Sequence, residues 1–143
     1  MIAEVSLSPE TPVVVHIAGK RYAIGDKEEF FYRRLALQQA RQRLQAAATT
    51  CRGGHGRARK LALLESFEKK EHHCVHHKLH LYSRRLIDLC LQHHAATILL
   101  VGQEEKEAAA REDRFLLRNW SYYALKEKIA YKAKRVGITV LSE

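Results

Sequence analysis

The sequence predicts a mixed α/β fold in which a long helical hairpin separates a β-hairpin from a strand–helix–strand unit. Apolar, β-branched runs lie near both ends of the chain, at 13–24, 96–101 and 138–141, and a helical pattern fills most of the residues between them. The chain also has only 2 prolines and 7 glycines among 143 residues, which favours long regular elements over a loop-rich scaffold.

The first predicted element is a β-hairpin over residues 13–25. A β-branched run from Val13 to Ile17 is followed by Ala18 and Gly19, and then by a second, partly alternating run that ends at Ile24. Gly19 suits the turn because glycine adopts a positive φ at no steric cost.

A helical hairpin is expected over residues 26–93. Asp26 can cap its first helix, with Glu29 as the capping-box partner, and this helix should end near Ala48. Residues 51–60 hold three glycines and predict a basic, glycine-rich elbow between the helices. The second helix should then resume from Arg57 and extend for about 50 Å.

Residues 96–141 predict a βαβ unit with a parallel pair of strands. The segment 96–101 is typical of a buried strand, and a helix should run from Asn119 or Ser121 to Val136. Gly137 is placed to end that helix at its C′ position, and residues 138–141 supply the last strand. We therefore interpret residues 1–143 as one domain.

The charge of the chain favours a polyanionic partner. Lys and Arg total 25 against 16 acidic residues, a net charge of +9 before any of the 9 histidines is counted. Such a surplus most simply indicates nucleic acid. No apolar run is long enough to span a membrane, residues 1–12 lack a signal-peptide layout, and the three cysteines are widely spaced. We expect a cytoplasmic protein without a membrane partner.

Two segments concentrate the basic residues. Residues 33–60 hold eight basic residues and no acid, and residues 118–135 hold six basic residues and one acid. Clusters of this kind bind phosphates in a salt-dependent, sequence-independent manner. We predict nucleic-acid contacts from the elbow (Arg52, His55, Arg57, Arg59 and Lys60) and from the last helix (Lys132, Lys134 and Arg135).

The histidines allow a metal hypothesis, which the pattern does not favour. His72, His76 and His80 recur every four residues, and His73 and His77 repeat that spacing one position along. An i, i+4 pair on a helix can chelate zinc. The remaining ligands, however, would have to come from Cys74, Cys90 or His94. The alternative is that the rings lie on the helix surface and gain charge at low pH, so we predict no metal site.

The residues assemble no evident active site either. Two-metal phosphodiester hydrolysis needs several converging carboxylates, and the predicted strand ends provide none. The aromatic residues Trp120, Tyr122 and Tyr123 at the start of the last helix could stack bases, although anchoring that helix on the sheet explains them better.

Several blocks of the sequence resemble the RuvC-like nuclease region of TnpB, a transposon-associated protein related to type V CRISPR effectors. The blocks are Arg52-Gly53-Gly54-His55-Gly56-Arg57 with Lys60, Ser83-Arg84-Arg85-Leu86-Ile87-Asp88, Thr97-Ile98-Leu99-Leu100, and the most specific one, residues 115–123 continuing through 128–138. They occur in the family's order and cover nearly the whole chain.

The resemblance implies a partial RNase H-like (RuvC-like) fold with a long inserted helical hairpin. It also implies ancestry in RNA-guided DNA cleavage, with DNA or guide-type RNA as partners and Mg²⁺ as the cofactor of intact family members. The departures concern the catalytic acids. The family's opening strand, which carries the first Asp, is expected to be missing, and Val101 stands where the family has Glu. The last Asp and the family's zinc module would lie beyond Glu143. His80 matches one residue of a family Asn-His pair, but Leu79 replaces the Asn.

These features predict a nucleic-acid-binding, TnpB-like protein that lacks nuclease activity by itself and retains no cofactor. Two alternatives stay open. One is a nuclease subunit completed in trans by a partner that supplies the missing strand and acids. The other is a self-associating helical scaffold.

Overall fold

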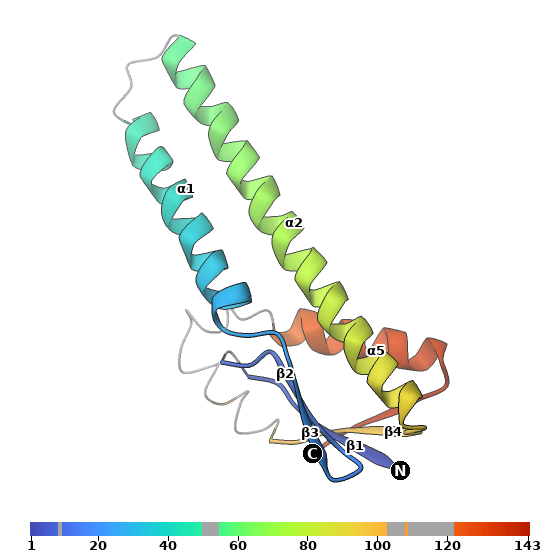
Figure 1. Ribbon diagram of the computed structural model, residues 1–143. Helices are drawn as coiled ribbons and strands as arrows, with labels where there is room; N and C mark the ends of the chain where they lie inside the picture. The colour runs from blue at the N-terminus through green and yellow to red at the C-terminus, as the bar shows by residue number, and fades with distance from the viewer. Residues whose placement is uncertain (9, 50–54, 103–107, 109–121) are drawn as a thin grey trace.

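The computed structural model describes residues 1–8, 10–49, 55–102, 108 and 122–143. The strands within them are β1 (Ile2–Ser6), β2 (Val13–Ile17), β3 (Lys20–Ile24), β4 (Thr97–Leu100) and β5 (Thr139–Ser142). The helices are a short π-helix, Glu28–Tyr32, followed by α1 (Arg33–Thr49), α2 (His55–Gln92) and α5 (Tyr122–Arg135). Figure 1 shows α1 and α2 projecting from the sheet as a hairpin, with α5 crossing α2 close to the sheet. The predicted mixed α/β architecture with a helical hairpin is confirmed.

The centre of the sheet corrects one expectation. The strand order is β3-β2-β1-β4-β5, so β1 lies in the middle, antiparallel to β2 and parallel to β4. The expectation of a missing opening strand is therefore wrong. The sequence pattern of this strand is weak, because residues 2–6 contain only two apolar residues that the sheet buries, Ala3 and Val5. Such a short alternation becomes a strand only when neighbours on both sides complete its hydrogen bonds.

The helices cover one face of this sheet. Alternate residues of the strands, such as Val5, Val15, Ile98 and Leu100, are fully buried there. Side chains on the opposite face are exposed or half-buried in the described part of the chain, with Ile2 56% exposed and Leu141 51% exposed. The core receives Tyr82 and Leu86 from α2 and Leu125 and Ile129 from α5.

The β-hairpin and the βαβ unit appear as predicted. β2 and β3 pair in register from Val13 opposite Ile24 to Ile17 opposite Lys20, and Gly19 has a φ of 75°. β4 and β5 are parallel. Gly137 ends α5 with a φ of 78°, and the Ile138 N–H donates to the Ala133 carbonyl at 2.9 Å, which closes the last turn.

Asp26 caps the start of the hairpin as predicted, whereas the predicted capping-box role of the Glu29 side chain is wrong, because its carboxylate reaches the other helix. The Glu29 N–H donates to the Asp26 carboxylate at 2.6 Å, while the Glu29 carboxylate pairs with Lys78 of α2. The first turn is nevertheless a π-helix, in which Phe30 and Phe31 are both buried.

One buried carboxylate joins the two long helices. Glu71 of α2, only 7% exposed, accepts hydrogen bonds from Arg34 Nε at 3.3 Å, Gln38 Nε2 at 2.9 Å and Arg41 Nη1 at 3.0 Å, all from α1. Because the acid lies on the other helix, two basic residues of α1, Arg34 and Arg41, look unpaired in the sequence and are paired in space.

The predicted elbow is shorter than expected. Residues 50–54 lie outside the described residues, and α2 begins at His55, so Gly56, Arg57, Arg59 and Lys60 lie within the helix. A single glycine costs a helix about 1 kcal/mol, which a helix of this length tolerates when good helix formers follow it. Gly56 therefore adds no loop flexibility at this end of α2.

In the described residues, no helix combines the length and the apolar character needed to cross a membrane.

Candidate nucleic-acid interface

The first predicted cluster lies at the tip of the helical hairpin. Arg57 and Arg59 are exposed on the first turns of α2. Lys60 is half-buried, and its Nζ lies 3.4 Å from the Ala47 carbonyl of α1. Arg52 lies outside the described residues, and His55 begins α2 with a side chain that is not described. The structure thus places two exposed basic residues, Arg57 and Arg59, on different sides of α2 at this tip, while Lys60 contacts the facing helix.

Lys132, in the second cluster, is bound to the neighbouring helix. Its Nζ donates to the His80 carbonyl at 2.8 Å and to the Ser83 Oγ at 2.8 Å, both on α2. Burial, together with the positive charges of Lys128 and Arg84, lowers the pKa of Lys132. Lys132 therefore helps to dock α5 on α2, and two of its three N–H groups are already engaged.

The other two residues of that cluster extend into solvent. Lys134 and Arg135 are exposed near the end of α5. Arg135 Nη1 donates to the Tyr131 hydroxyl at 3.0 Å, and its guanidinium lies 5.7 Å from the centre of the Tyr131 ring. This stacking orients the guanidinium beside an exposed aromatic ring, an arrangement that suits a phosphate and an unstacked base together.

The structure does not bring the two clusters together. Arg57 lies near the start of α2, whereas Lys132 contacts α2 at His80 and Ser83, about 35 Å further along the helix axis. Figure 1 shows the hairpin tip far from α5. A single short ligand cannot reach both clusters, but an extended polyanion can.

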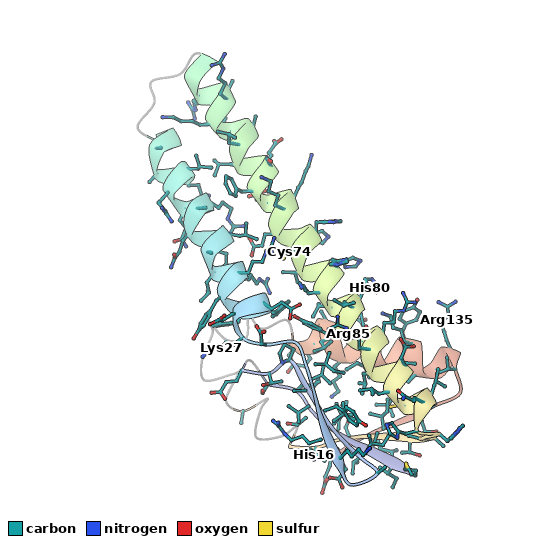
Figure 2. The ribbon with its side chains drawn as sticks, viewed as in Figure 1. His16, Lys27, Cys74, His80, Arg85 and Arg135 are labelled. Carbon is teal, nitrogen blue, oxygen red and sulfur yellow. The ribbon has the colours of Figure 1, made fainter. Side chains whose placement is uncertain are left out.

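A third group of basic residues lies between α2 and α5, and of its members only Lys132 was predicted from the sequence. His80, Arg84 and Lys132 line a hollow of about 310 Å³, together with His77 and Leu81. A second hollow of about 390 Å³ shares Arg84 and Lys132 and continues toward Tyr131 and Arg135. Figure 2 shows His80 and Arg135 on the same side of the molecule. The spacing of the histidines was visible in the sequence, but nothing in it revealed that α5 packs beside them.

The histidines themselves do not form a zinc site with the cysteines. Cys90 is fully buried in the core, and burial raises the pKa of its thiol to about 11, which disfavours the thiolate that zinc requires. Cys74 and Cys90 are both free thiols. Among the described residues, no group of three or more His, Cys, Asp or Glu side chains could hold a metal ion.

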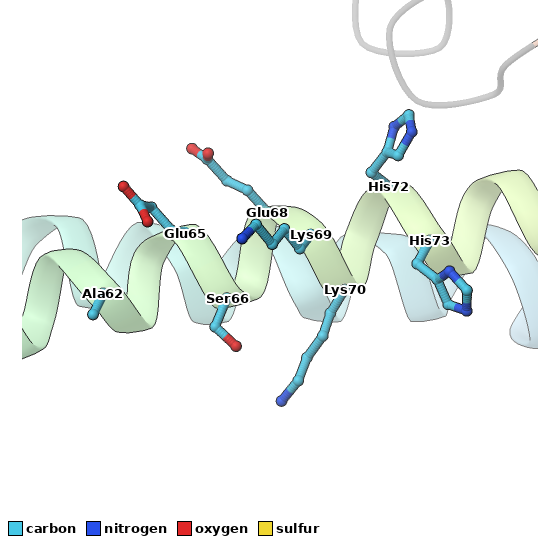
Figure 3. A pocket seen from close by; sticks show the side chains of 8 residues that line it. All are labelled: Ala62, Glu65, Ser66, Glu68, Lys69, Lys70, His72 and His73. Atoms are coloured by element: carbon cyan, nitrogen blue, oxygen red, sulfur yellow. The ribbon is translucent and has the colours of Figure 1, made fainter.

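A depression of about 870 Å³ along α2 does not supply a site either. It is lined by Ala62, Glu65, Ser66, Glu68, Lys69, Lys70, His72 and His73. Figure 3 shows that these side chains diverge around the helix: Glu65, Glu68 and His72 point to one side, and Ser66, Lys70 and His73 point to the other. Side chains that diverge cannot enclose a small ligand.

The described residues do not fit a magnesium site. Glu4, the one acid of β1, is exposed on the open face of the sheet and lies opposite Leu99 of β4. Val101, which follows β4, is apolar, and its N–H donates to the Val5 carbonyl at 3.0 Å. Mg²⁺ needs several oxygen ligands, and two-metal catalysis needs several carboxylates. The described residues that lie beside Glu4 on its neighbouring strands, His16 and Leu99, offer no second carboxylate. Of the predicted aromatic block, Trp120 lies outside the described residues and the side chain of Tyr122 is not described, whereas Tyr123 is 49% exposed and does not anchor α5 on the sheet.

Comparison with known proteins identifies relatives among CRISPR-associated nucleases. No family model matches the chain. The chain is 37% identical over 92 residues to the CRISPR-associated endodeoxyribonuclease Cas12f1 of Sulfoacidibacillus thermotolerans, which covers 63% of this chain and 21% of that protein. It is 35% identical over 91 residues to Cas12f1 of Syntrophomonas palmitatica, covering 64% of this chain and 18% of that protein. The chain thus spans about a fifth of the length of the curated relatives it matches.

Two solved structures show the fold over almost the whole chain. A Cas12f1–sgRNA–target DNA complex matches 99% of this chain and 28% of its own, with a TM-score of 0.69 and 22% identity. A CRISPR-Cas12f ternary complex matches 97% of this chain and 27% of its own, with a TM-score of 0.70 and 22% identity. The predicted partial RuvC-like α/β fold is confirmed. The relatives also support the CRISPR-related part of the sequence prediction, whereas neither of them is a TnpB protein. The chain is therefore similar to Cas12f1 in sequence over 92 residues and in fold over nearly its whole length.

Proposed function

We propose that this chain is a nucleic-acid-binding segment related to RNA-guided, TnpB-like and Cas12f1-type DNA endonucleases, and that it does not cleave DNA by itself. The observation that carries the proposal is the exposed basic surface at two places on one rigid scaffold, the hairpin tip and the end of α5. The similarity to Cas12f1 supports it, because one matching structure is a complex with sgRNA and target DNA.

Each basic cluster has a distinct part in this proposal. Arg57 and Arg59 contact phosphates at the hairpin tip, together with Arg52, His55 and Lys60. Lys134 and Arg135 contact phosphates at the end of α5, while Lys132 offers its remaining N–H from the groove between the helices. Phosphate contacts release counterions, so binding should weaken steeply with salt and depend little on sequence.

Salt-dependent binding tests the proposal. Fluorescence anisotropy with labelled single-stranded DNA, duplex DNA and structured RNA, between about 50 and 200 mM salt, should show affinity for at least one of them that falls with salt. The double substitution Arg57→Gln/Arg59→Gln should reduce the slope of log K against log salt by about 1.5. Absence of binding to all three probes at the lower salt concentration would refute the proposed function.

A matched control separates a local contact from net charge. Lys20 and Arg21 are exposed on β3, at the end of the molecule opposite the hairpin tip. The variant Lys20→Gln/Arg21→Gln makes the same change in net charge and should leave the slope nearly unchanged. Equal effects of the two double variants would mean that net charge alone drives binding. A parallel incubation with Mg²⁺ should show no cleavage, and Mg²⁺-dependent cleavage would contradict the second half of the proposal.

The open face of the sheet favours one alternative, a nuclease subunit completed in trans. Ile2 and Leu141 are about half exposed there, and β5 forms an edge of the five-stranded sheet. Exposed apolar residues beside an unpaired strand edge favour association with another chain. Mg²⁺-dependent cleavage by a reconstituted pair, absent for either chain alone, would favour this alternative. A stable oligomer that ignores nucleic acid, seen by sedimentation, would instead favour the helical scaffold.

A further inference from the structure

Two histidines of α2, His76 and His80, are in direct contact beside the hollow between α2 and α5, which His80 also lines. His76 Nε2 and His80 Nε2 lie 3.1 Å apart, and the two ring centroids are separated by 4.5 Å with nearly perpendicular planes. A contact of this length between two ring nitrogens is a hydrogen bond, so one Nε2 carries a hydrogen and the other accepts it. The pair in this geometry therefore holds at least one ring whose Nε2 is unprotonated.

The surroundings of the histidine pair are positive. Lys128 and Lys132 face it from α5, and His72, His73 and His77 face it from α2. Lys128 is the main cause of the lowered pKa of His76, and burial followed by Lys128 lowers the pKa of His80. Arg84 lines the same hollow, and its nearest acid, Asp88, is 4.0 Å away in a pair that is largely exposed. The charges on this surface repel a metal cation and attract an anion.

We propose that the histidine pair and the lysines of α5 form a phosphate-binding site for the nucleic-acid backbone, and that binding there takes up a proton. This inference rests on the proposed function and specifies where and how the backbone is held. The proposed site includes Lys128, Arg84, His76 and His80, none of which was predicted from the sequence as a phosphate contact.

The proton balance follows from the hydrogen bonds. A phosphodiester oxygen only accepts hydrogen bonds, so the accepting Nε2 must gain a hydrogen before both rings can donate to the ligand. The hydrogen comes from solvent, and the His76–His80 bond is replaced by two bonds to phosphate oxygen. A change of tautomer would instead move a hydrogen from Nδ1 to Nε2 of the same ring with no net proton uptake, and the proton count by calorimetry distinguishes the two cases. Proton uptake is favoured because the phosphate charge offsets the repulsion from Lys128, one of the causes that disfavour the protonated rings in the free protein.

The direction of the pH dependence can be stated. Phosphate raises the pKa of the accepting ring from its lowered value in the free protein. The affinity for the nucleic acid should therefore rise as the pH falls from the pKa of this ring in the complex to its lower pKa in the free protein. Below the pKa of the free protein the affinity should level off. We expect binding to be about three- to tenfold tighter at about pH 6 than at about pH 8, at constant ionic strength.

Anisotropy titrations of the full chain with labelled single-stranded DNA at these two pH values test the proposal. The variant His76→Gln/His80→Gln should lose most of the pH dependence and retain salt-sensitive binding. The control His16→Gln/His94→Asn removes two exposed histidines outside the groove and should behave as the unsubstituted chain. Asn suits position 94 because it tolerates the positive φ of 56° found there.

Calorimetry counts the protons directly. The binding enthalpy of the same DNA, measured in buffers with different enthalpies of ionisation, should show about one proton taken up near neutral pH by the unsubstituted chain, and clearly fewer by His76→Gln/His80→Gln. The same calorimetric measurement with inorganic phosphate shows whether the site binds phosphate alone or needs an extended nucleic-acid backbone. Unchanged proton uptake in the double variant, with binding intact, overturns this inference and leaves the proposed function standing. Loss of binding by every form of the chain, the unsubstituted one included, overturns the proposed function instead.

Discussion

At the scale of single residues, two glycines in similar conformations have different structural roles. Gly25 has a φ of 77° and Gly19 a φ of 75°, so both occupy the left-handed region that disfavours side chains. A Cβ added to Gly25 would lie 2.7 Å from atoms of the Tyr82 ring, whereas a Cβ at Gly19 would meet nothing within 4 Å. Gly25 is thus required for packing as well as for conformation.

Substitution of the two glycines should separate these causes. Gly19→Ala should lower the free energy of unfolding by about 1–2 kcal/mol, the cost of the left-handed conformation alone. Gly25→Ala should cost about 1–3 kcal/mol more, because the Tyr82 ring is buried and cannot move away freely. Urea denaturation followed by circular dichroism measures both values. Equal losses in the two variants would show that the contact with Tyr82 yields without cost.

The histidine pair gives a residue-scale prediction in the free protein. Lys128→Gln should raise the pKa of His76 toward its ordinary value of 6.5, because the charge of Lys128 is the main cause of its lowering. Since the pKa of His76 is lower in the folded than in the unfolded chain, its contribution to stability is present above pH 6.5 and is lost as the pH falls through the folded pKa. NMR titration of the imidazole protons measures the shift, and an unchanged value would exclude the lysine as its cause.

At the scale of elements, Glu71 holds α1 and α2 together. Its carboxylate is 10% exposed, and the Arg34 and Arg41 side chains that pair with it are 17% and 23% exposed. Removal of one partner from a largely buried ionic network is costly, because it leaves the remaining charges without compensation. The network also shows why charge alone could not assign the basic residues of α1 to a binding surface: Arg34 and Arg41 are already paired with Glu71.

Glu71→Gln should therefore destabilise the chain by about 2–4 kcal/mol. The matched control is Glu65→Gln, an exposed acid on the same helix, which should change the free energy of unfolding by less than about 0.5 kcal/mol. The midpoint of urea denaturation reports both variants. If Glu71→Gln denatures at the same urea concentration as the control, the network contributes nothing to the stability of the hairpin.

At the scale of the whole molecule, the long hairpin separates the part of the chain that packs in the core from an exposed basic tip. The second half of α2 packs with α5 on the sheet and holds the core residues Tyr82 and Leu86, while its first turns extend far from the sheet and present Arg57 and Arg59. An extended scaffold of this kind suits a long polyanion that touches several places, and not a small ligand held in one pocket.

Local patterns in the sequence were enough for the β-hairpin, the cap at Asp26, the helical hairpin and the parallel pair that follows it. Each of these depends on neighbouring residues: alternation, a capping side chain, a glycine that allows positive φ. The exposed position of Arg57 and Arg59 could also be anticipated, because an acid-free run of arginines is rarely buried.

Only the tertiary structure decided which charges remain available and where the sheet has its centre. Ile2–Ser6 becomes the middle strand because strands distant in sequence pair on both of its sides. Arg34 and Arg41 are paired with an acid about thirty residues or more away in the sequence. Lys132 is hydrogen-bonded to α2, and the charge of Lys128 on α5 lowers the pKa of His76 on α2. Electrostatic and hydrogen-bonding partners are set by distance in space, and a linear pattern does not contain that distance.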